Sequence, residues 1–213
     1  MPKSESVFFH FRLHAVTDNQ TLESEDFYRR AELLCRAGGV AINLRAHQLS
    51  GRDFFEHAGK LRSLTAEAEV PLIINDRLDV ALAVRADAVH LGERSIPLQQ
   101  AVPLCRERGL VCGYSCHDPE QAALAEKNSV DYIYIGTIFP SASKPDVAAA
   151  GVALIEKITR LVDCPVFAIG GVNPENASQV ARAGAFGCAA ITGFWHCPNQ
   201  KAAVRNYLAA FKD

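Results

Sequence analysis

The amino-acid sequence predicts a single (β/α)8 barrel, and three observations support that fold class. Eight short apolar segments alternate with longer segments whose apolar residues recur at helical spacing. Strands that alternate with helices imply a parallel sheet, and eight such units in 213 residues fit a closed barrel better than an open doubly wound sheet. No linker or change of composition divides the chain. We therefore expect one barrel domain over residues 11–213, preceded by a loose N-terminal tail over residues 1–10.

The strands and helices follow one another along the whole sequence. Between the strands, apolar residues such as Phe27, Ala31 and Leu34 lie on one face of a helix. In chain order, the eight predicted strands lie at residues 11–17, 40–45, 71–75, 87–91, 110–115, 131–136, 165–169 and 187–191.

Two helix starts are marked by capping residues. After the fifth strand, Asp118 is a candidate N-cap, Pro119 fits the first helical position, and Gln121 completes a pattern that resembles a capping box. After the seventh strand, we expect Asn173 and Pro174 in the same roles. These caps place the preceding residues at the carboxyl ends of strands, which is the active-site face of a barrel.

Composition excludes several classes of partner. The 22 basic and 24 acidic residues are spread without long runs and give a net charge of −2, so a nucleic-acid partner is not expected. No apolar run of about eighteen residues and no signal peptide are present, so we expect no membrane partner. The seven cysteines are odd in number and lie in apolar segments. They are typical of buried thiols in a reducing cytosol, and no spacing indicates a zinc site.

The second strand directs polar side chains toward the barrel interior. Side chains alternate along a strand, so Ile42 and Leu44 face the helices while Asn43 and Arg45 face inward, with His47 following at the rim. An inward arginine in a concave site is typical of binding to an anionic substrate. The alternative is an arginine that caps a helix or pairs with a neighbouring acid.

The fifth strand carries a candidate acid/base residue. The same alternation puts Ser115 and His117 on the inner side and Cys112 and Tyr114 on the helix side. Because imidazole titrates near neutral pH, His117 fits a general acid or base, and Ser115 accompanies it. A purely structural histidine is the alternative, and His90 on the fourth strand is interpreted in that way.

Two glycine-bearing turns follow the last two strands, where barrels commonly bind phosphate through backbone N–H groups. A further loop at residues 136–151 carries small residues, hydroxyls and one lysine, which indicates a loop that closes over an anion or else a solvated surface loop. The candidate phosphate-binding residues of the turns are Gly170, Gly171, Ile191, Thr192 and Gly193, and the loop adds Ser141, Ser143 and Lys144.

The third and fourth strands raise the question of a metal site. The third ends with Asn75, a candidate substrate ligand, and Asp76, which could bind magnesium. The fourth leads into "VHLGERSIP", where Glu93 is the only carboxylate and Arg94 stands beside it. An arginine next to the candidate ligand opposes a cation, so we expect no metal in this loop.

Long segments of the chain resemble the thiamine-phosphate synthase and thiazole tautomerase (TenI-like) superfamily, in the family's order and across nearly the whole sequence. They are "LHAVTD", "LIINDRLDVALAVRADAVHLG", "GYSCHDPEQAALAEKNSVDYIYIG", "FPSASK" and "FAIGGVNPENASQVARAGAFGCAAITG". The resemblance implies a barrel that binds a thiazole phosphate. Synthases of this family couple it to a pyrimidine diphosphate with magnesium and release diphosphate, whereas tautomerases isomerise the carboxythiazole phosphate.

Carried over residue by residue, the resemblance matches the family's site only in part. The synthase pattern Gln-x-Arg-x-Lys appears as Asn43, Arg45 and His47, which keeps the arginine and loses the lysine. The first magnesium aspartate is matched by Asp76, and the second falls on Ser95. The remaining matches are Ser141, Ser143 and Lys144 for diphosphate, Gly170, Gly171, Ile191 and Thr192 for the thiazole phosphate, and Ser115 with His117.

These departures favour a tautomerase, an isomerase without cofactor in which His117 moves the proton. The alternative is the synthase, a transferase that would use magnesium held by Asp76. A third hypothesis is a regulatory binder that kept the phosphate pocket and lost catalysis. The resemblance also implies a possible homodimer, and we expect a cytoplasmic enzyme of thiamine biosynthesis.

Overall fold

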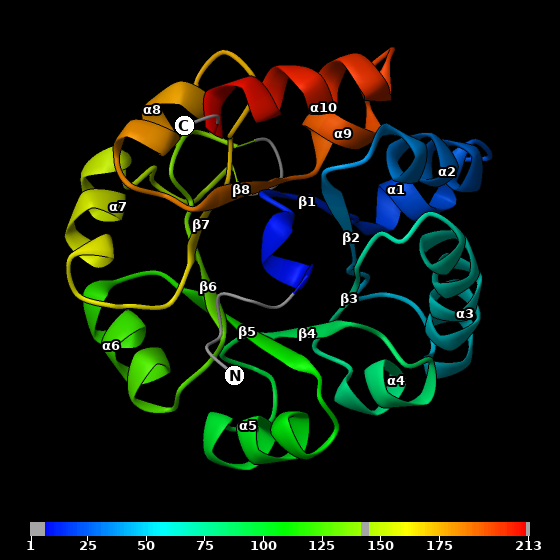
Figure 1. Ribbon diagram of the computed structural model, residues 1–213, viewed down its shortest axis with the longest axis horizontal. Helices are drawn as coiled ribbons and strands as arrows, with labels where there is room; N and C mark the ends of the chain where they lie inside the picture. Colours follow the sequence, from blue (N-terminus) through cyan, green and yellow to red (C-terminus); the bar gives the residue numbers. More distant parts are fainter. Residues whose placement is uncertain (1–6, 142–144, 212–213) are drawn as a thin grey trace.

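The computed structural model describes residues 7–141 and 145–211, and its eight parallel strands close into one barrel with helices around the outside (Figure 1). Each strand pairs with the next in sequence, and β8 pairs with β1. The predicted (β/α)8 barrel is confirmed. The strands are β1 (Leu13–Val16), β2 (Val40–Leu44), β3 (Leu72–Asn75), β4 (Ala88–Leu91), β5 (Val111–Cys116), β6 (Tyr132–Ile135), β7 (Val166–Ile169) and β8 (Gly187–Ala190).

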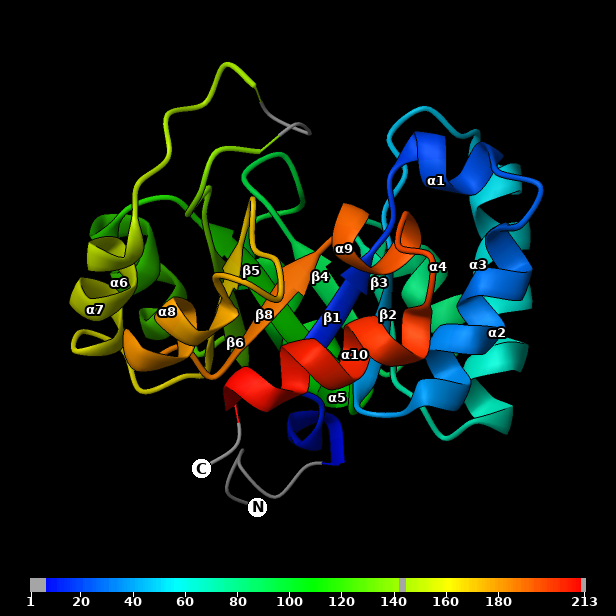
Figure 2. The same cartoon turned by 90° about the horizontal axis from the view of Figure 1, so that it is seen from above.

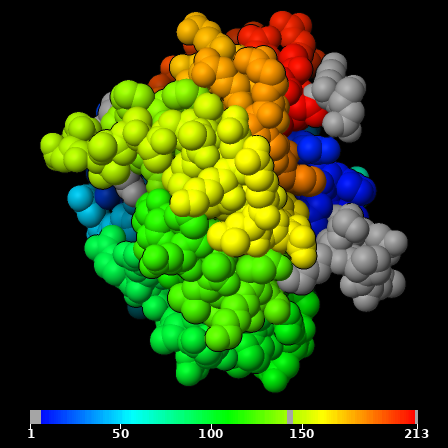
Figure 3. All heavy atoms as spheres, turned by 90° about the vertical axis from the view of Figure 1, so that its left-hand side faces the viewer, coloured from blue at the N-terminus to red at the C-terminus, as the bar shows by residue number. Residues whose placement is uncertain are grey.

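The helices pack on the outer surface of the strands. In the space-filling view from the side of α6 and α7, these two helices cover the barrel (Figure 3). The helices are α1 (Asn19–Glu23), α2 (Phe27–Ala37), α3 (Gly51–Glu67), α4 (Leu78–Ala83), α5 (Leu98–Glu107), α6 (Pro119–Lys127), α7 (Val152–Thr159), α8 (Ala177–Arg182), α9 (Thr192–Trp195) and α10 (Gln200–Leu208), with short 3-10 turns η2 (Val7–His10) and η3 (Ala209–Phe211).

The alternation predicted for β2 and β5 is confirmed. Ile42, Leu44 and Cys112 belong to the core between strands and helices. A second apolar cluster fills the barrel interior and includes Tyr132, Tyr134 and Phe167. All seven cysteines are free thiols and six of them are buried, as expected for small apolar side chains.

The structure differs from the predicted loose tail at residues 7–10. Phe8 and Phe9 of η2 are buried and belong to the barrel-interior cluster, where the Phe8 ring lies 5.4 Å from that of Tyr132. Figure 2 shows η2 at the opposite end of the barrel from the loop that follows β6. The tail prediction overlooked that a barrel needs apolar side chains to close its lower end.

The two predicted helix caps have different outcomes. Asp118 accepts a hydrogen bond from the backbone N–H of Gln121 at 2.8 Å, and α6 begins at Pro119 as predicted. After β7, the Asn173 side chain accepts from the backbone N–H of Asn176, but α8 begins only at Ala177. Asn173 therefore stabilises a turn that precedes the helix. Within the described ranges, no helix is long and apolar enough to cross a membrane.

Candidate functional site

A cavity of about 530 Å³ opens at the carboxyl ends of the strands, and residues from all eight strands or their following loops line it. Most of the predicted site residues meet there. They are Arg45, His47, Asn75, Asp76, Ser115, His117, Ser141, Gly170, Gly171, Ile191 and Thr192. Asn43 and Gly193 do not line the cavity. Ser143 and Lys144 lie outside the described residues.

Arg45 follows β2 and brings a positive charge to the cavity. The end of β1 holds its backbone, because the Thr17 hydroxyl accepts a hydrogen bond from Arg45 N–H and donates one to Arg45 C=O. Burial lowers the pKa of the guanidinium, and the nearby carboxylates of Asp76 and Asp18 oppose that shift. In the part of the chain that the structure describes, Arg45 forms hydrogen bonds only through its backbone, so the guanidinium donors are available to an anionic ligand.

Asn43 lies deeper in the barrel and belongs to a buried polar network. Its side-chain N–H donates to the Tyr134 hydroxyl at 3.1 Å, and His14 Nδ1 lies 2.6 Å from the same hydroxyl. The Asn43 side chain is completely buried and its Oδ1 has no partner among the described residues. Asn43 therefore supports the floor of the cavity, whereas the sequence predicted a substrate ligand.

His90 reaches from the same interior to the cavity. Its Nε2 lies 2.8 Å from the Ser115 hydroxyl and its Nδ1 lies 3.2 Å from the Tyr132 hydroxyl. Burial strongly lowers the pKa of His90, so the ring is neutral. Sequence reasoning treated His90 as structural and overlooked that it orients Ser115. The signal that could have identified it is its inward register beside Gly113 of the neighbouring strand, two residues before Ser115.

His117 is exposed at the end of β5. Its Nδ1 lies 2.6 Å from the carbonyl oxygen of Gly136, and since a carbonyl only accepts, Nδ1 carries the hydrogen. The backbone N–H of His117 donates a hydrogen bond to Oε1 of the Gln121 side chain. The side-chain N–H of Gln121 in turn donates to the Glu93 carboxylate at 2.6 Å. The capping residue Gln121 thus connects His117 to the loop after β4.

Asp76 presents a carboxylate at the cavity wall in a defined orientation. Its Oδ1 accepts a hydrogen bond from the Ser95 hydroxyl at 2.5 Å, and its Oδ2 accepts from the Asn75 amide at 2.6 Å. Glu93 and Arg94 line the same cavity. No cluster of three or more His, Cys, Asp or Glu side chains suited to a metal ion occurs in residues 7–141 and 145–211. A metal ion here would need ligand oxygens from substrate and water.

The turn after β7 exposes backbone N–H groups to the cavity. Gly170 and Gly171 have φ values of 91° and 65°, which only glycine adopts at little cost. The carbonyl of Gly170 accepts from the backbone N–H of Phe139, and that of Gly171 accepts from the Asn176 side chain. Within the described chain, the N–H groups of Gly170, Gly171 and Ile191 donate to no protein acceptor. This arrangement suits a phosphate.

Gly193 and Gly171, both predicted to bind phosphate, lie in close packing contacts. A Cβ at Gly193 would lie 2.0 Å from the Tyr207 hydroxyl. A Cβ at Gly171 would lie 2.4 Å from the carbonyl oxygen of Pro140. Both glycines are therefore required by close packing between segments of this chain.

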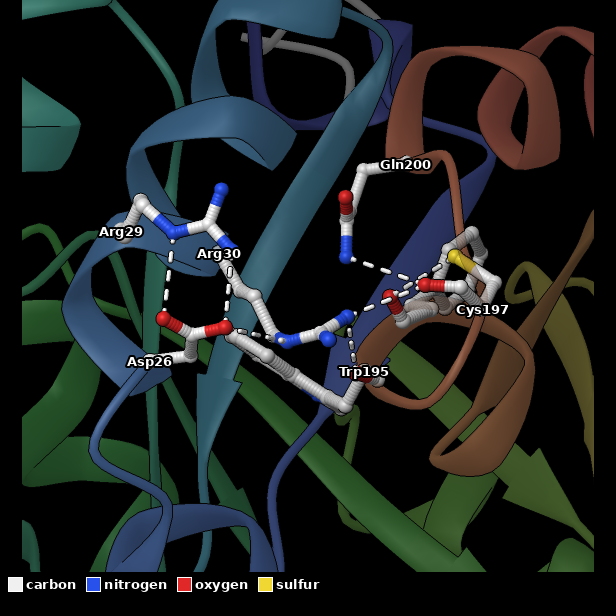
Figure 4. A network of polar contacts seen from close by, with 7 residues as sticks. Asp26, Arg29, Arg30, Trp195, Cys197 and Gln200 are labelled. Carbon is white, nitrogen blue, oxygen red and sulfur yellow. Dashed lines mark hydrogen bonds and ion pairs between the residues drawn. The ribbon is translucent and has the colours of Figure 1, made fainter.

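The short helix α9 is anchored from the outside of the barrel. One guanidinium nitrogen of Arg30 donates to the carbonyl oxygens of Trp195 and Cys197, both at 3.0 Å (Figure 4). The Trp195 indole N–H donates to the carbonyl oxygen of Val16 on β1 at 2.8 Å. Sequence reasoning did not identify Arg30, because its partners lie more than 160 positions away.

Comparison with known proteins identifies the family. The family profile described as thiamine monophosphate synthase matches residues 13–194. The thiamine-phosphate synthase of Clostridium acetobutylicum is 38% identical over 183 residues, covering 86% of each chain, and that of Caldanaerobacter subterraneus is 37% identical over 207 residues, covering 95% of this chain and 96% of the relative. The solved structure of a thiamine phosphate pyrophosphorylase from Pyrococcus furiosus superposes with a TM-score of 0.85 at 30% identity, covering 97% and 98% of the two chains.

These relatives overturn one prediction from the sequence. They are named as synthases, which are transferases, so the predicted tautomerase and isomerase activity is wrong. The departures from the synthase pattern at His47 and Ser95 therefore do not identify a tautomerase. The predicted absence of a cofactor followed from the tautomerase prediction and therefore loses its support. The possible homodimer and the cytoplasmic location stay predictions. By its family profile and its relatives, the chain belongs to the thiamine monophosphate synthase family.

Proposed function

We propose that this protein is a thiamine-phosphate synthase, which couples hydroxymethylpyrimidine diphosphate to a thiazole phosphate and releases diphosphate. The observation that carries the proposal is that one cavity contains two separate anion-binding elements. Arg45 follows β2, and the turn of Gly170 and Gly171 follows β7. Since β2 and β7 lie three strands apart around the closed eight-stranded barrel, separated by β1 and β8, the two elements can hold two phosphorylated substrates with their reactive ends between them.

The reaction requires one bond to break and one to form. The bond between the pyrimidine methylene carbon and the diphosphate oxygen breaks, and its electron pair leaves with diphosphate. The thiazole nitrogen gives its lone pair to the same carbon, so the new C–N bond forms without removal of a proton. Catalysis then depends on positioning the two substrates and on stabilising the negative charge of the leaving diphosphate.

Different residues of the cavity have different roles in this reaction. The permanently charged guanidinium of Arg45 attracts the diphosphate, and free backbone N–H groups at Gly170 and Gly171 bind the thiazole phosphate. Ser115, oriented by His90, offers a hydroxyl to the heterocycle of a substrate.

The donor set of the cavity fits a magnesium ion. Mg²⁺ prefers oxygen ligands and commonly takes only one or two protein carboxylates, with phosphate oxygens and water completing its six positions. Asp76 would hold it, and Glu93 lines the same wall. Ser95 replaces the second aspartate of the family pattern but fixes the orientation of Asp76. The ion would neutralise charge on the leaving diphosphate.

A coupling assay tests the proposal. The purified protein is incubated with both substrates in magnesium buffer, and thiamine phosphate and diphosphate are measured by mass spectrometry and a coupled diphosphate assay. We expect the two products in a one-to-one ratio, and no product after chelation by EDTA. A reaction without the thiazole phosphate serves as the control. Absence of thiamine phosphate at every magnesium concentration would show that the chain has another activity.

A further inference from the structure

Tyr207, in the C-terminal helix α10, contacts both turns that face the phosphate end of the cavity. Its hydroxyl donates a hydrogen bond to the carbonyl oxygen of Val172, in the turn after β7, at 2.9 Å. The same hydroxyl packs against Gly193 of α9, where an added Cβ would lie 2.0 Å away. The side chain is completely buried. One hydroxyl group therefore touches the segments that follow β7 and β8.

The contact at Val172 completes the fixation of the turn after β7. The peptide between Val172 and Asn173 is held at both ends, because its carbonyl accepts from Tyr207 and its N–H donates to the Asn176 side chain. The preceding carbonyls of Gly170 and Gly171 also accept hydrogen bonds. With three successive carbonyls bound on the protein side, the N–H groups of Gly170 and Gly171 remain for a ligand.

The contact at Gly193 sets how closely α10 approaches α9. The Tyr207 ring packs on Phe194 with centroids 4.7 Å apart, and the hydroxyl occupies the space that a side chain at position 193 would need. Because interiors are close-packed, a change of one atom at this contact shifts the neighbouring backbone. The position of α9 relative to the turn after β7 therefore depends on this hydroxyl.

We propose that Tyr207 is a positioning residue for the thiazole phosphate, although it lies outside the cavity. It keeps the turn of Gly170 and Gly171 at a fixed separation from the segment of Ile191 and Thr192, so that backbone N–H groups of both can bind one phosphate. This inference rests on the proposed function for the identity of the ligand. It predicts that loss of the hydroxyl weakens binding of the thiazole phosphate and leaves the diphosphate side unchanged.

Steady-state kinetics of Tyr207→Phe test the inference. The substitution removes only the hydroxyl, so we expect KM for the thiazole phosphate to rise about 3- to 10-fold, as the loss of one buried hydrogen bond implies. KM for the pyrimidine diphosphate should stay the same, and kcat should change by less than about twofold. Tyr28→Phe is the matched control, because it removes a helical tyrosine hydroxyl that bonds to His57.

A double-mutant cycle with Gly193→Ala separates positioning from a general loss of stability. The single variant Gly193→Ala forces its new Cβ against the Tyr207 hydroxyl and should raise KM for the thiazole phosphate. In the Tyr207→Phe background the nearest atom, the hydroxyl oxygen, is absent. Gly193→Ala should therefore raise KM for the thiazole phosphate by a smaller factor in this background than in the wild type. Thermal unfolding of each variant accompanies the kinetics, and inorganic phosphate is titrated by calorimetry as an independent probe.

The outcomes of the two proposals are distinguishable. If the wild type makes no thiamine phosphate, the proposed function fails, whatever Tyr207→Phe does to inorganic phosphate binding. If the wild type is active and Tyr207→Phe has the kinetic constants of Tyr28→Phe, the positioning role of Tyr207 is wrong. An equal rise of KM for both substrates, or additive effects in the cycle, would also overturn it.

Discussion

The hydroxyl of Ser95 donates a hydrogen bond of 2.5 Å to Oδ1 of Asp76, across the gap between the loops that follow β4 and β3. Ser95 also accepts a hydrogen bond from the backbone N–H of Gly92 at 2.9 Å, so its side chain is held in one orientation. Where the synthase pattern carries a second carboxylate, this chain therefore carries a neutral group that orients the first.

Replacing Ser95 by Asp should strengthen magnesium binding. A second carboxylate beside Asp76 adds a hard anionic ligand at the same wall of the cavity. We expect the magnesium concentration for half-maximal coupling to fall by roughly tenfold. Ser63→Asp, on an exposed face of α3, is the control and should leave it unchanged. A higher magnesium requirement in Ser95→Asp would mean that the Ser95 hydrogen bond matters more than added charge.

Arg45 should be the main protein contact of the diphosphate. Arg45→Ala removes a half-buried cation at the cavity wall, so KM for the pyrimidine diphosphate should rise about 10- to 100-fold. Arg45→Lys should restore only part of this loss, because the ammonium lacks the planar fork of donors. Steady-state kinetics with Arg36→Ala, a surface arginine of α2, provide the comparison. Unchanged KM in Arg45→Ala would exclude the contact.

His117 should be dispensable for proton transfer. The coupling reaction removes no proton from the thiazole, so His117→Ala should lower kcat by less than the 10²- to 10⁴-fold typical of a lost general base. The expected loss is about tenfold or smaller, from the side-chain hydrogen bond to the carbonyl oxygen of Gly136. Single-turnover rates measured from pH 6 to 9 check this. A drop of 10³-fold with a changed pH profile would assign His117 to proton transfer.

The buried histidines should make the fold sensitive to acid. Burial lowers the pKa of His14 from 6.5 to about 3 and shifts that of His90 in the same direction. At His14 the unfolded chain takes up a proton below pH 6.5 that the folded chain refuses until about pH 3, and His90 adds to the effect in the same direction. The free energy of unfolding should therefore fall as pH drops through this window, by up to about 1.4 kcal/mol per pH unit for each histidine.

Urea unfolding of His14→Gln and of the exposed-residue control His10→Gln, measured at several pH values, tests this dependence. The slope of stability against pH should decrease only in His14→Gln. The ring NMR signals of wild-type His14 should not shift between pH 7.5 and 5. This measurement tests the same prediction on the wild type if His14→Gln does not fold. A midpoint near pH 6.5 for His14 would contradict the prediction.

Arg30 should stabilise the fold more than its neighbour Arg29. Arg30→Ala removes two charge-assisted hydrogen bonds to the carbonyls of Trp195 and Cys197, and the free energy of unfolding should fall by about 1.5–3 kcal/mol. Arg29 is exposed and pairs only with Asp26 among the described residues, so Arg29→Ala should lower the free energy of unfolding by much less than Arg30→Ala does. Urea denaturation of the two variants compares them directly, and equal losses would show that the anchor of α9 contributes little.

The sequence by itself determined the barrel and the direction of its side chains. Alternation along a strand is a local property, so Ile42 and Asn43 could be assigned to opposite faces before any tertiary contact was known. The cap of α6 at Asp118 is equally local, since its partner lies three positions away. The segments shared with the synthase and tautomerase superfamily also identified the family.

Only the tertiary structure decided which of the inward residues reach the cavity and what supports them. Asn43 lies below the cavity floor, and the contacts of Ser95 with Asp76 and of Tyr207 with Val172 join positions 19 and 35 residues apart. Such distances depend on how barrel closure brings the strand ends and outer helices together, which no local pattern encodes. The physical reason is that side-chain direction follows from the strand itself, whereas hydrogen-bond partners depend on the packing of the whole chain.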